Sequence, residues 1–146
     1  MEDETTLSRQ GHRLLRAGSG LFLLALLVGM AIPVFAVPRL GLATHLLGIT
    51  QGIFLLVLGL VWPRLTLGPL QARAANGLAV YGCLAPWTAN LLGAIWGAGS
   101  SMLPMAAGAA RGSDLQEAVI RVLLVSGALS LVGTMVLVVW GLRRQR

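Results

Sequence analysis

The chain has 146 residues, of which 56% are hydrophobic and only 11% are charged, and its mean hydropathy is +0.82. Soluble domains carry about 25% charged residues and disordered chains combine low hydrophobicity with high charge, so both classes are excluded. The formal net charge is +6 with arginine as the only basic residue besides histidine. These arginines stand at the ends of apolar runs, which indicates membrane topology and argues against nucleic-acid binding.

Four apolar segments divide the chain, at about residues 20–37, 41–62, 74–97 and 118–142. Each approaches or exceeds the ~20 residues that cross a bilayer as a helix, and lipid offers no partners to unpaired backbone groups. The sequence therefore predicts an all-α integral membrane four-helix bundle that forms a single domain over residues 1–146.

The first segment follows three arginines between residues 9 and 16. An alternative interpretation makes residues 1–36 a signal peptide, with a small-residue cleavage site at Val34-Phe35-Ala36. Three further spans follow, and cleavage would leave the termini of the bundle on opposite sides. A permanent first span is the preferred interpretation.

The second segment carries His45, and Gly48 and Gly52 follow on the same helix face at i+3 and i+7. Neutral imidazole is a standard axial ligand of haem iron. A glycine stripe allows a flat group or another backbone to approach closely. One hypothesis is a haem on this face with His45 as its iron ligand. The other is a helix–helix contact in which His45 hydrogen-bonds to a carbonyl group or to water.

The third segment places Cys83, Trp87 and Asn90 on one stripe at i, i+4 and i+7. At ~1.5 Å per residue, Trp87, Asn90 and Gln51 of the second segment lie in the same half of the bilayer as His45. These side chains predict a polar pocket between the second and third segments. Alternatively, Gln51 and Asn90 form hydrogen bonds between helices and Trp87 only packs.

The tryptophans at segment ends, Trp62 and Trp140, are expected in an interfacial belt. Between residues 98 and 112 lies a stretch rich in Gly, Ala, Ser and Met, which is long enough to fold over one end of the bundle. Ser113 followed by Gln116 predicts a capping box at the start of the fourth span.

The arginines also predict the orientation. Eight of them lie in the two terminal segments and in the loop between the second and third spans, against three near the other loops. The positive-inside rule then places both termini in the cytoplasm of a multi-pass inner-membrane protein. No acidic residue lies within a span, which argues against a carboxylate proton relay, and the single cysteine excludes an intrachain disulfide.

The stretch His45-Leu-Leu-Gly-Ile-Thr-Gln51-Gly52, the apolar run that ends at Pro63, and Trp87-Thr-Ala-Asn90 resemble the hydroxylaminobenzene mutase and styrene oxide isomerase family. The resemblance implies a trimeric four-helix membrane enzyme that binds haem b between subunits. It implies His45 as the iron ligand, with Gly48 and Gly52 beside the cofactor. It also implies Gln51, Trp87 and Asn90 as catalytic residues that act on a small aromatic substrate.

Two departures from the isomerase branch favour the mutase branch. Gln51 replaces an Asn of that branch, and Ala94 stands where that branch has a Tyr. We therefore expect an isomerase that converts N-aryl hydroxylamines to 2-aminophenols with haem as Lewis acid. The alternatives are an aryl-epoxide isomerase on the same scaffold and a non-enzymatic membrane subunit whose glycine stripe binds a partner helix.

Overall fold

The computed structural model describes the backbone of residues 2–143 and the side chains of residues 9–143. Four long helices form the molecule: α1 (Glu2–Met30), α2 (Pro38–Val61), α3 (Pro69–Trp96) and α5 (Asp114–Arg143). A short helix α4 (Pro104–Ala107) precedes α5, and 3-10 turns lie at Ile32–Val34 and Trp62–Arg64. The described part of the chain holds no strand. All four long helices are apolar enough to cross a membrane, which confirms the predicted fold class.

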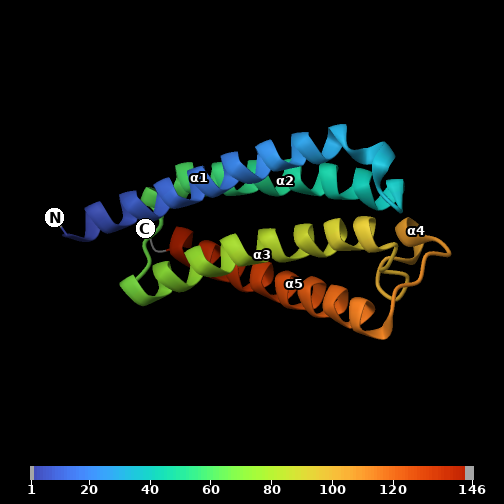
Figure 1. Ribbon diagram of the computed structural model, residues 1–146. Coiled ribbons are helices and arrows are strands. Elements are labelled where there is room, and N and C mark those ends of the chain that lie inside the picture. The colour runs from blue at the N-terminus through green and yellow to red at the C-terminus, as the bar shows by residue number, and fades with distance from the viewer. Residues whose placement is uncertain (1, 144–146) are drawn as a thin grey trace.

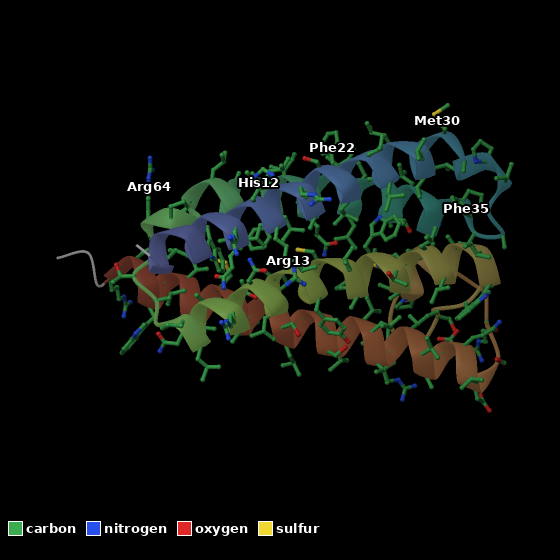
Figure 2. All side chains as sticks on the ribbon, turned by 60° about the vertical axis from the view of Figure 1, so that its left-hand side comes forward. His12, Arg13, Phe22, Met30, Phe35 and Arg64 are labelled. Atoms are coloured by element: carbon green, nitrogen blue, oxygen red, sulfur yellow. The ribbon has the colours of Figure 1, made fainter. Side chains whose placement is uncertain are left out.

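The helices are arranged as two antiparallel pairs (Figure 1). α1 packs along α2, α5 packs along α3, and α2 and α3 join the pairs. The two ends of the chain lie at the same end of the bundle (Figure 1). Arg64 lies toward that end and Phe35 lies at the opposite end (Figure 2).

The first span requires a correction. We expected it at 20–37, but the helix begins at Glu2 and ends at Met30, and its apolar part covers Arg9–Met30. Pro33 has no backbone N–H to continue the helix and sits in a 3-10 turn, and Pro38 begins α2. The other three predicted segments coincide with α2, α3 and α5, apart from a few residues at their ends.

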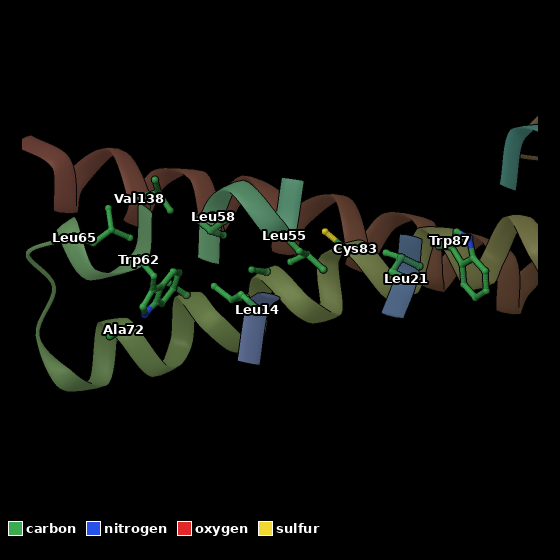
Figure 3. Close-up of a cluster of buried hydrophobic side chains, with 12 residues drawn as sticks. Leu14, Leu21, Leu55, Leu58, Trp62, Leu65, Ala72, Cys83, Trp87 and Val138 are labelled. Carbon is green, nitrogen blue, oxygen red and sulfur yellow. The ribbon is translucent and has the colours of Figure 1, made fainter. Parts of the chain in front are cut away.

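The core lies between α1, α2 and α3 (Figure 3). Trp62 lies toward one end of this core with 0% exposure, and its Nε1 donates a hydrogen bond to Gln10 Oε1 at 3.1 Å (Figure 3). The expectation that Trp62 belongs to an interfacial belt is therefore wrong, because the turn after α2 directs the indole inward. Trp140 is 50% exposed near the end of α5, as a belt residue would be.

Glycines allow α1 and α2 to approach closely. A Cβ added to Gly59 would lie 2.9 Å from the carbonyl oxygen of Gly11, and one added to Gly52 would lie 3.0 Å from that of Gly18. Leu14 and Leu21 of α1 are buried in the same interface. The first helix is thus a full part of the core, which favours a permanent span over a cleaved leader.

The stretch from residue 98 to 112 folds over one end of the bundle, as expected. Glu117 organises it, because its carboxylate accepts hydrogen bonds from the backbone N–H of Gly99 (2.7 Å), the N–H and hydroxyl of Ser101 (3.2 and 2.7 Å) and the N–H of Gly112 (3.3 Å). Ser113 and Gln116 form the predicted capping box, with bonds of 2.8 and 3.3 Å.

Gly59→Ala should destabilise the bundle by about 1–3 kcal/mol, because the added methyl group meets the backbone of α1. The matched control is Gly77→Ala in α3, where a Cβ would meet nothing within 4 Å. Thermal unfolding in detergent, followed by circular dichroism, should show a lower Tm for Gly59→Ala only. Equal Tm values for the two variants would contradict close α1–α2 packing.

Glu117→Ala should release the loop at 98–112, because four hydrogen bonds lose their shared acceptor. Hydrogen exchange at the amides of Gly99 and Gly112 should then be faster by about tenfold or more, as for loss of a charged acceptor. Asp114→Ala removes the same charge from the same helix turn and should leave those amides protected. Unchanged exchange in Glu117→Ala would show that the loop is held by other contacts.

Candidate functional site

His45 lies on the side of α2 that faces α1. Its Nδ1 is 2.7 Å from the carbonyl oxygen of Ala25. A carbonyl only accepts hydrogen bonds, so Nδ1 carries the proton and Nε2 keeps its lone pair. Gly29 admits the ring, since a Cβ there would lie 2.5 Å from Nδ1. The half-buried imidazole is therefore held in one orientation with Nε2 free to coordinate.

This geometry fits an axial haem ligand. Histidines that bind metals usually donate their other N–H to a carbonyl or carboxylate, which fixes the tautomer. The same hydrogen bond satisfies the alternative expectation, a contact between His45 and a carbonyl group. The described residues contain no cluster of three or more His, Cys, Asp or Glu that could hold a metal ion. A haem needs only an axial ligand from the protein, because the porphyrin supplies the other ligands, and one imidazole can serve as that ligand.

The glycine stripe of α2 faces protein atoms instead of open space. A Cβ on Gly48 would lie 2.5 Å from Trp87 Nε1 and 2.7 Å from the Cβ of Ala25. Gly52 meets Gly18 and Phe22 of α1 in the same way. Within one chain, Gly48 and Gly52 thus admit the indole and α1. Of the predicted haem-binding residues, only His45 fits a haem within one chain. Gly48 and Gly52 face protein atoms and leave no space for a porphyrin there.

Trp87 and Gln51 are the unusual polar groups of this half of the bundle. The structure brings Trp87 of α3 against Gly48 of α2, but the cavity that Gln51 lines is not lined by Trp87. Trp87 is 7% exposed and Gln51 is 7% exposed, yet Trp87 Nε1 and Gln51 Oε1 have no hydrogen-bond partner. A buried unpaired donor or acceptor costs about 1–3 kcal/mol, so these two atoms are candidates for hydrogen bonds to a ligand. The described residues hold a third such atom, Asn76 Oδ1, toward the other end of α3.

Asn90 is buried one turn beyond Trp87, and its Nδ2 donates to the carbonyl oxygen of Pro86 at 2.9 Å. That bond lies within α3. Gln51 has no side-chain hydrogen bond in the described part of the chain. Neither Gln51 nor Asn90 therefore forms the hydrogen bond between helices that the alternative interpretation expected.

His45 and Gln51 lie on different sides of α2. His45 faces α1, whereas Gln51 lines a cavity of about 340 Å³ with Cys83 of α3 and with Leu131 and Met135 of α5. One ligand within a single chain would therefore have to pass around α2 to reach both. This separation follows from helix geometry. Six residues correspond to about 600° of rotation, which leaves the two side chains about 120° apart around the axis of α2.

The sequence reasoning missed Gly29, Leu131 and Met135. Gly29 had a signal, since it is a glycine inside an apolar helix, but only the packing of α1 on α2 shows that it faces His45. Leu131 and Met135 carried no signal, because they are two apolar residues in an apolar segment. Only the position of α5 beside α3 places them at the cavity.

The site has neutral chemistry. It offers an imidazole lone pair, an amide oxygen, an indole N–H and apolar walls. Such groups polarise and orient a substrate and exclude water, and no carboxylate is among them. An isomerisation, in which no external proton or electron is needed in the balance, is the reaction class that these groups suit.

Comparisons with known proteins agree with this chemistry. Residues 10–143 match the sequence model of styrene oxide isomerase. Hydroxylaminobenzene mutase HabB of Ectopseudomonas oleovorans is 50% identical over 132 residues, which are 90% of this chain and 80% of the relative. Hydroxylaminobenzene mutase HabA of the same organism is 43% identical over 113 residues, or 77% of this chain and 84% of the relative.

No solved structure matches the chain. The match to the family nevertheless covers α2, α3 and α5, most of α1 and the residues of the site. The chain therefore belongs to the styrene oxide isomerase family and is a membrane isomerase.

Proposed function

We propose that the chain is a hydroxylaminobenzene mutase, which converts an N-aryl hydroxylamine to a 2-aminophenol. The N–O bond breaks and a C–O bond forms at the ortho ring carbon. The proton that leaves this carbon is balanced by one taken up on nitrogen, so there is no net oxidation. The observation that carries the proposal is the pair of buried, unpaired groups, Gln51 Oε1 and Trp87 Nε1. The names of two relatives with 50% and 43% identity support it.

His45 would hold haem b through Nε2, because Nδ1 is engaged by Ala25. When bound, ferric haem would supply a Lewis acid for the N–O oxygen of the substrate. Gly48 and Gly52 would lie next to the iron ligand on α2, where they keep α1 and Trp87 close to His45.

The protein side chains would orient the substrate and exclude water. Gln51 Oε1 can accept a hydrogen bond from the N–H or O–H of the hydroxylamine, and Trp87 Nε1 can donate one to the hydroxyl oxygen. Asn90, one turn from Trp87, would help to hold the migrating hydroxyl group. The indole face of Trp87 would stabilise positive charge that develops on the ring. Apolar walls would keep bulk water from capturing the electron-poor ring.

Two copies of the chain would complete the site. His45 and Gln51 lie on different sides of α2, so a ligand that contacts both types of residue is best placed between subunits. We therefore propose a homo-oligomer, a trimer in keeping with the family resemblance, with His45 from one subunit facing the substrate groups of another. In this arrangement Gly48 and Gly52 stay in the α1–α2 contact of each subunit.

The arginine distribution supports an orientation with both termini in the cytoplasm of a cell inner membrane. Both termini lie at the end of the bundle that also holds Arg64 (Figures 1 and 2). An apolar aromatic substrate would then reach the site from the bilayer.

Aryl-epoxide isomerisation is the second candidate, because the family model that matches residues 10–143 is that of styrene oxide isomerase. The same apolar, water-poor site would open the epoxide and guide the rearrangement. Incubation of purified protein with phenylhydroxylamine and with styrene oxide in separate reactions distinguishes the two activities.

His45→Ala should lose haem and mutase activity together, because it removes the one imidazole that Ala25 holds with Nε2 available for iron. The absorbance of the Soret band measures haem, and formation of 2-aminophenol from phenylhydroxylamine measures activity. His12→Ala, which changes an exposed histidine of α1, should keep both. Full haem occupancy in His45→Ala would contradict the assignment of the ligand.

Gln51→Leu should lower turnover per bound haem by roughly 10²-fold, the scale for loss of one preorganised hydrogen-bonding group. It should not lower the melting temperature, because Gln51 Oε1 has no partner to lose. Asn90→Leu is the comparison, since it also removes a bond to Pro86 and should lower both turnover and Tm. Rate per haem and Tm should be measured on the same samples. Unchanged turnover in Gln51→Leu would leave it without a role in the reaction.

A further inference from the structure

A crevice opens between α2 and α5. It exists because α1 covers one side of α2 and α5 packs along α3, so the facing sides of α2 and α5 are not in close contact. The crevice has a volume of about 340 Å³ and has Cys83 of α3 in its lining. Leu47, Thr50, Gln51 and Phe54 line it from α2, and Leu131 and Met135 line it from α5.

Of the polar side chains that line the crevice, only Gln51 lacks a hydrogen-bond partner and is not an apolar-like thiol. The hydroxyl of Thr50 donates to the carbonyl oxygen of Leu46 at 2.9 Å, within α2. The thiol of Cys83 is buried and behaves as a small apolar group. Gln51 Oε1 is thus the one buried side-chain oxygen of the lining that lacks a partner in the described structure. The crevice therefore suits a ligand with an apolar body and one small polar group that hydrogen-bonds to the Gln51 amide.

Its size fits an aromatic ring. An apolar cavity of about 150 Å³ is enough to bind benzene in a protein interior. The crevice has about 340 Å³, so it holds one ring with substituents or two fused rings. The ring of Phe54 and the thioether of Met135 provide the flat and polarisable surfaces that aromatic ligands contact.

A route from the bilayer leads into it. A second groove of about 550 Å³ shares Leu131 and Met135 with the crevice and runs along α5 to Trp140 and Arg143. Met135 is 43% exposed and stands where the groove and crevice meet. An apolar ligand dissolved in lipid can therefore enter without crossing the core of the bundle.

We propose that this crevice is the aryl-binding pocket of the enzyme, with the ring between Phe54 and Met135 and the hydroxylamine N–H or O–H donated to Gln51 Oε1. Met135 is then a specificity-determining residue, because its side chain sets the length of ring that fits. This proposal rests on the proposed function, in that it names the subsite for the substrate of that reaction. It assigns to α5 a part in the site that no motif of the sequence indicates.

The first test compares two substrates, phenylhydroxylamine and the larger 2-naphthylhydroxylamine. Met135→Ala should raise kcat/KM for the naphthyl compound relative to the phenyl compound by about tenfold or more, the scale for a change of pocket size. Met135→Trp should lower kcat/KM for both compounds, and more for the naphthyl one. Leu129→Trp, at a residue that is 67% exposed and does not line the crevice, should leave the ratio unchanged. An unchanged ratio in both Met135 variants overturns the proposal.

The second test measures binding without turnover. The wild-type protein is photolabelled with phenyl azide, with and without excess aniline, and the labelled residues are mapped by mass spectrometry. Labelling at Phe54 and Met135 should be suppressed at least tenfold by aniline, whereas labelling at the exposed Leu129 should not change. Equal labelling at all three residues with aniline present overturns the pocket.

The two tests separate the pocket from the reaction. If aniline protects Phe54 and Met135 of the wild-type protein from photolabelling but the protein forms no 2-aminophenol, the proposed reaction fails and the aryl-binding pocket stands. If 2-aminophenol forms but aniline protects neither residue, the reaction stands and the pocket is overturned.

Discussion

The interior of a membrane offers no water to hydrogen-bond with polar side chains, and this constraint shapes the bundle. Most polar residues of the spans meet it locally: Thr44, Thr50, Ser130 and Thr134 each bond to the carbonyl oxygen four residues earlier in the same helix. His45 and Asn90 also reach backbone carbonyls. Gln51 Oε1 and Trp87 Nε1 are exceptions in the half of the bundle near His45. Because their cost is not offset inside the chain, we propose that these two atoms hydrogen-bond to a ligand.

Close packing of α1 on α2 has a direct consequence for the histidine. Gly52 and Gly59 bring the two backbones together, and this approach places the carbonyl of Ala25 within 2.7 Å of the His45 ring. Gly29 leaves room for the ring itself. A structural feature that looks like ordinary helix packing thus sets the tautomer of the imidazole. A free Nε2 is what coordination to iron requires.

The two pairs of helices also explain the open side of the molecule. Since α5 packs along α3 and not along α1, the bundle retains a crevice whose lining includes Gln51. The crevice and His45 then lie on different sides of α2. We propose that a second copy of the chain completes a site that joins them, because a ligand within one chain would have to pass around α2 to reach both.

The sequence by itself determined the fold class and the helix that carries each polar residue, because spans about 20 apolar residues long have no other stable form in lipid. It also determined the capping box at Ser113, which depends on residues only three apart. It misplaced the first span and the environment of Trp62, since Pro33 ends the helix earlier and the turn after α2 directs the indole inward. For the candidate site, too, the sequence indicated some residues and only the packing of the helices placed the others. His45, Gln51, Trp87 and Asn90 stand out in the sequence because polar groups are rare in spans. Gly29, Leu131 and Met135 do not, because their positions beside those groups depend on how helices distant in sequence pack, and an apolar segment carries no pattern that specifies its neighbour.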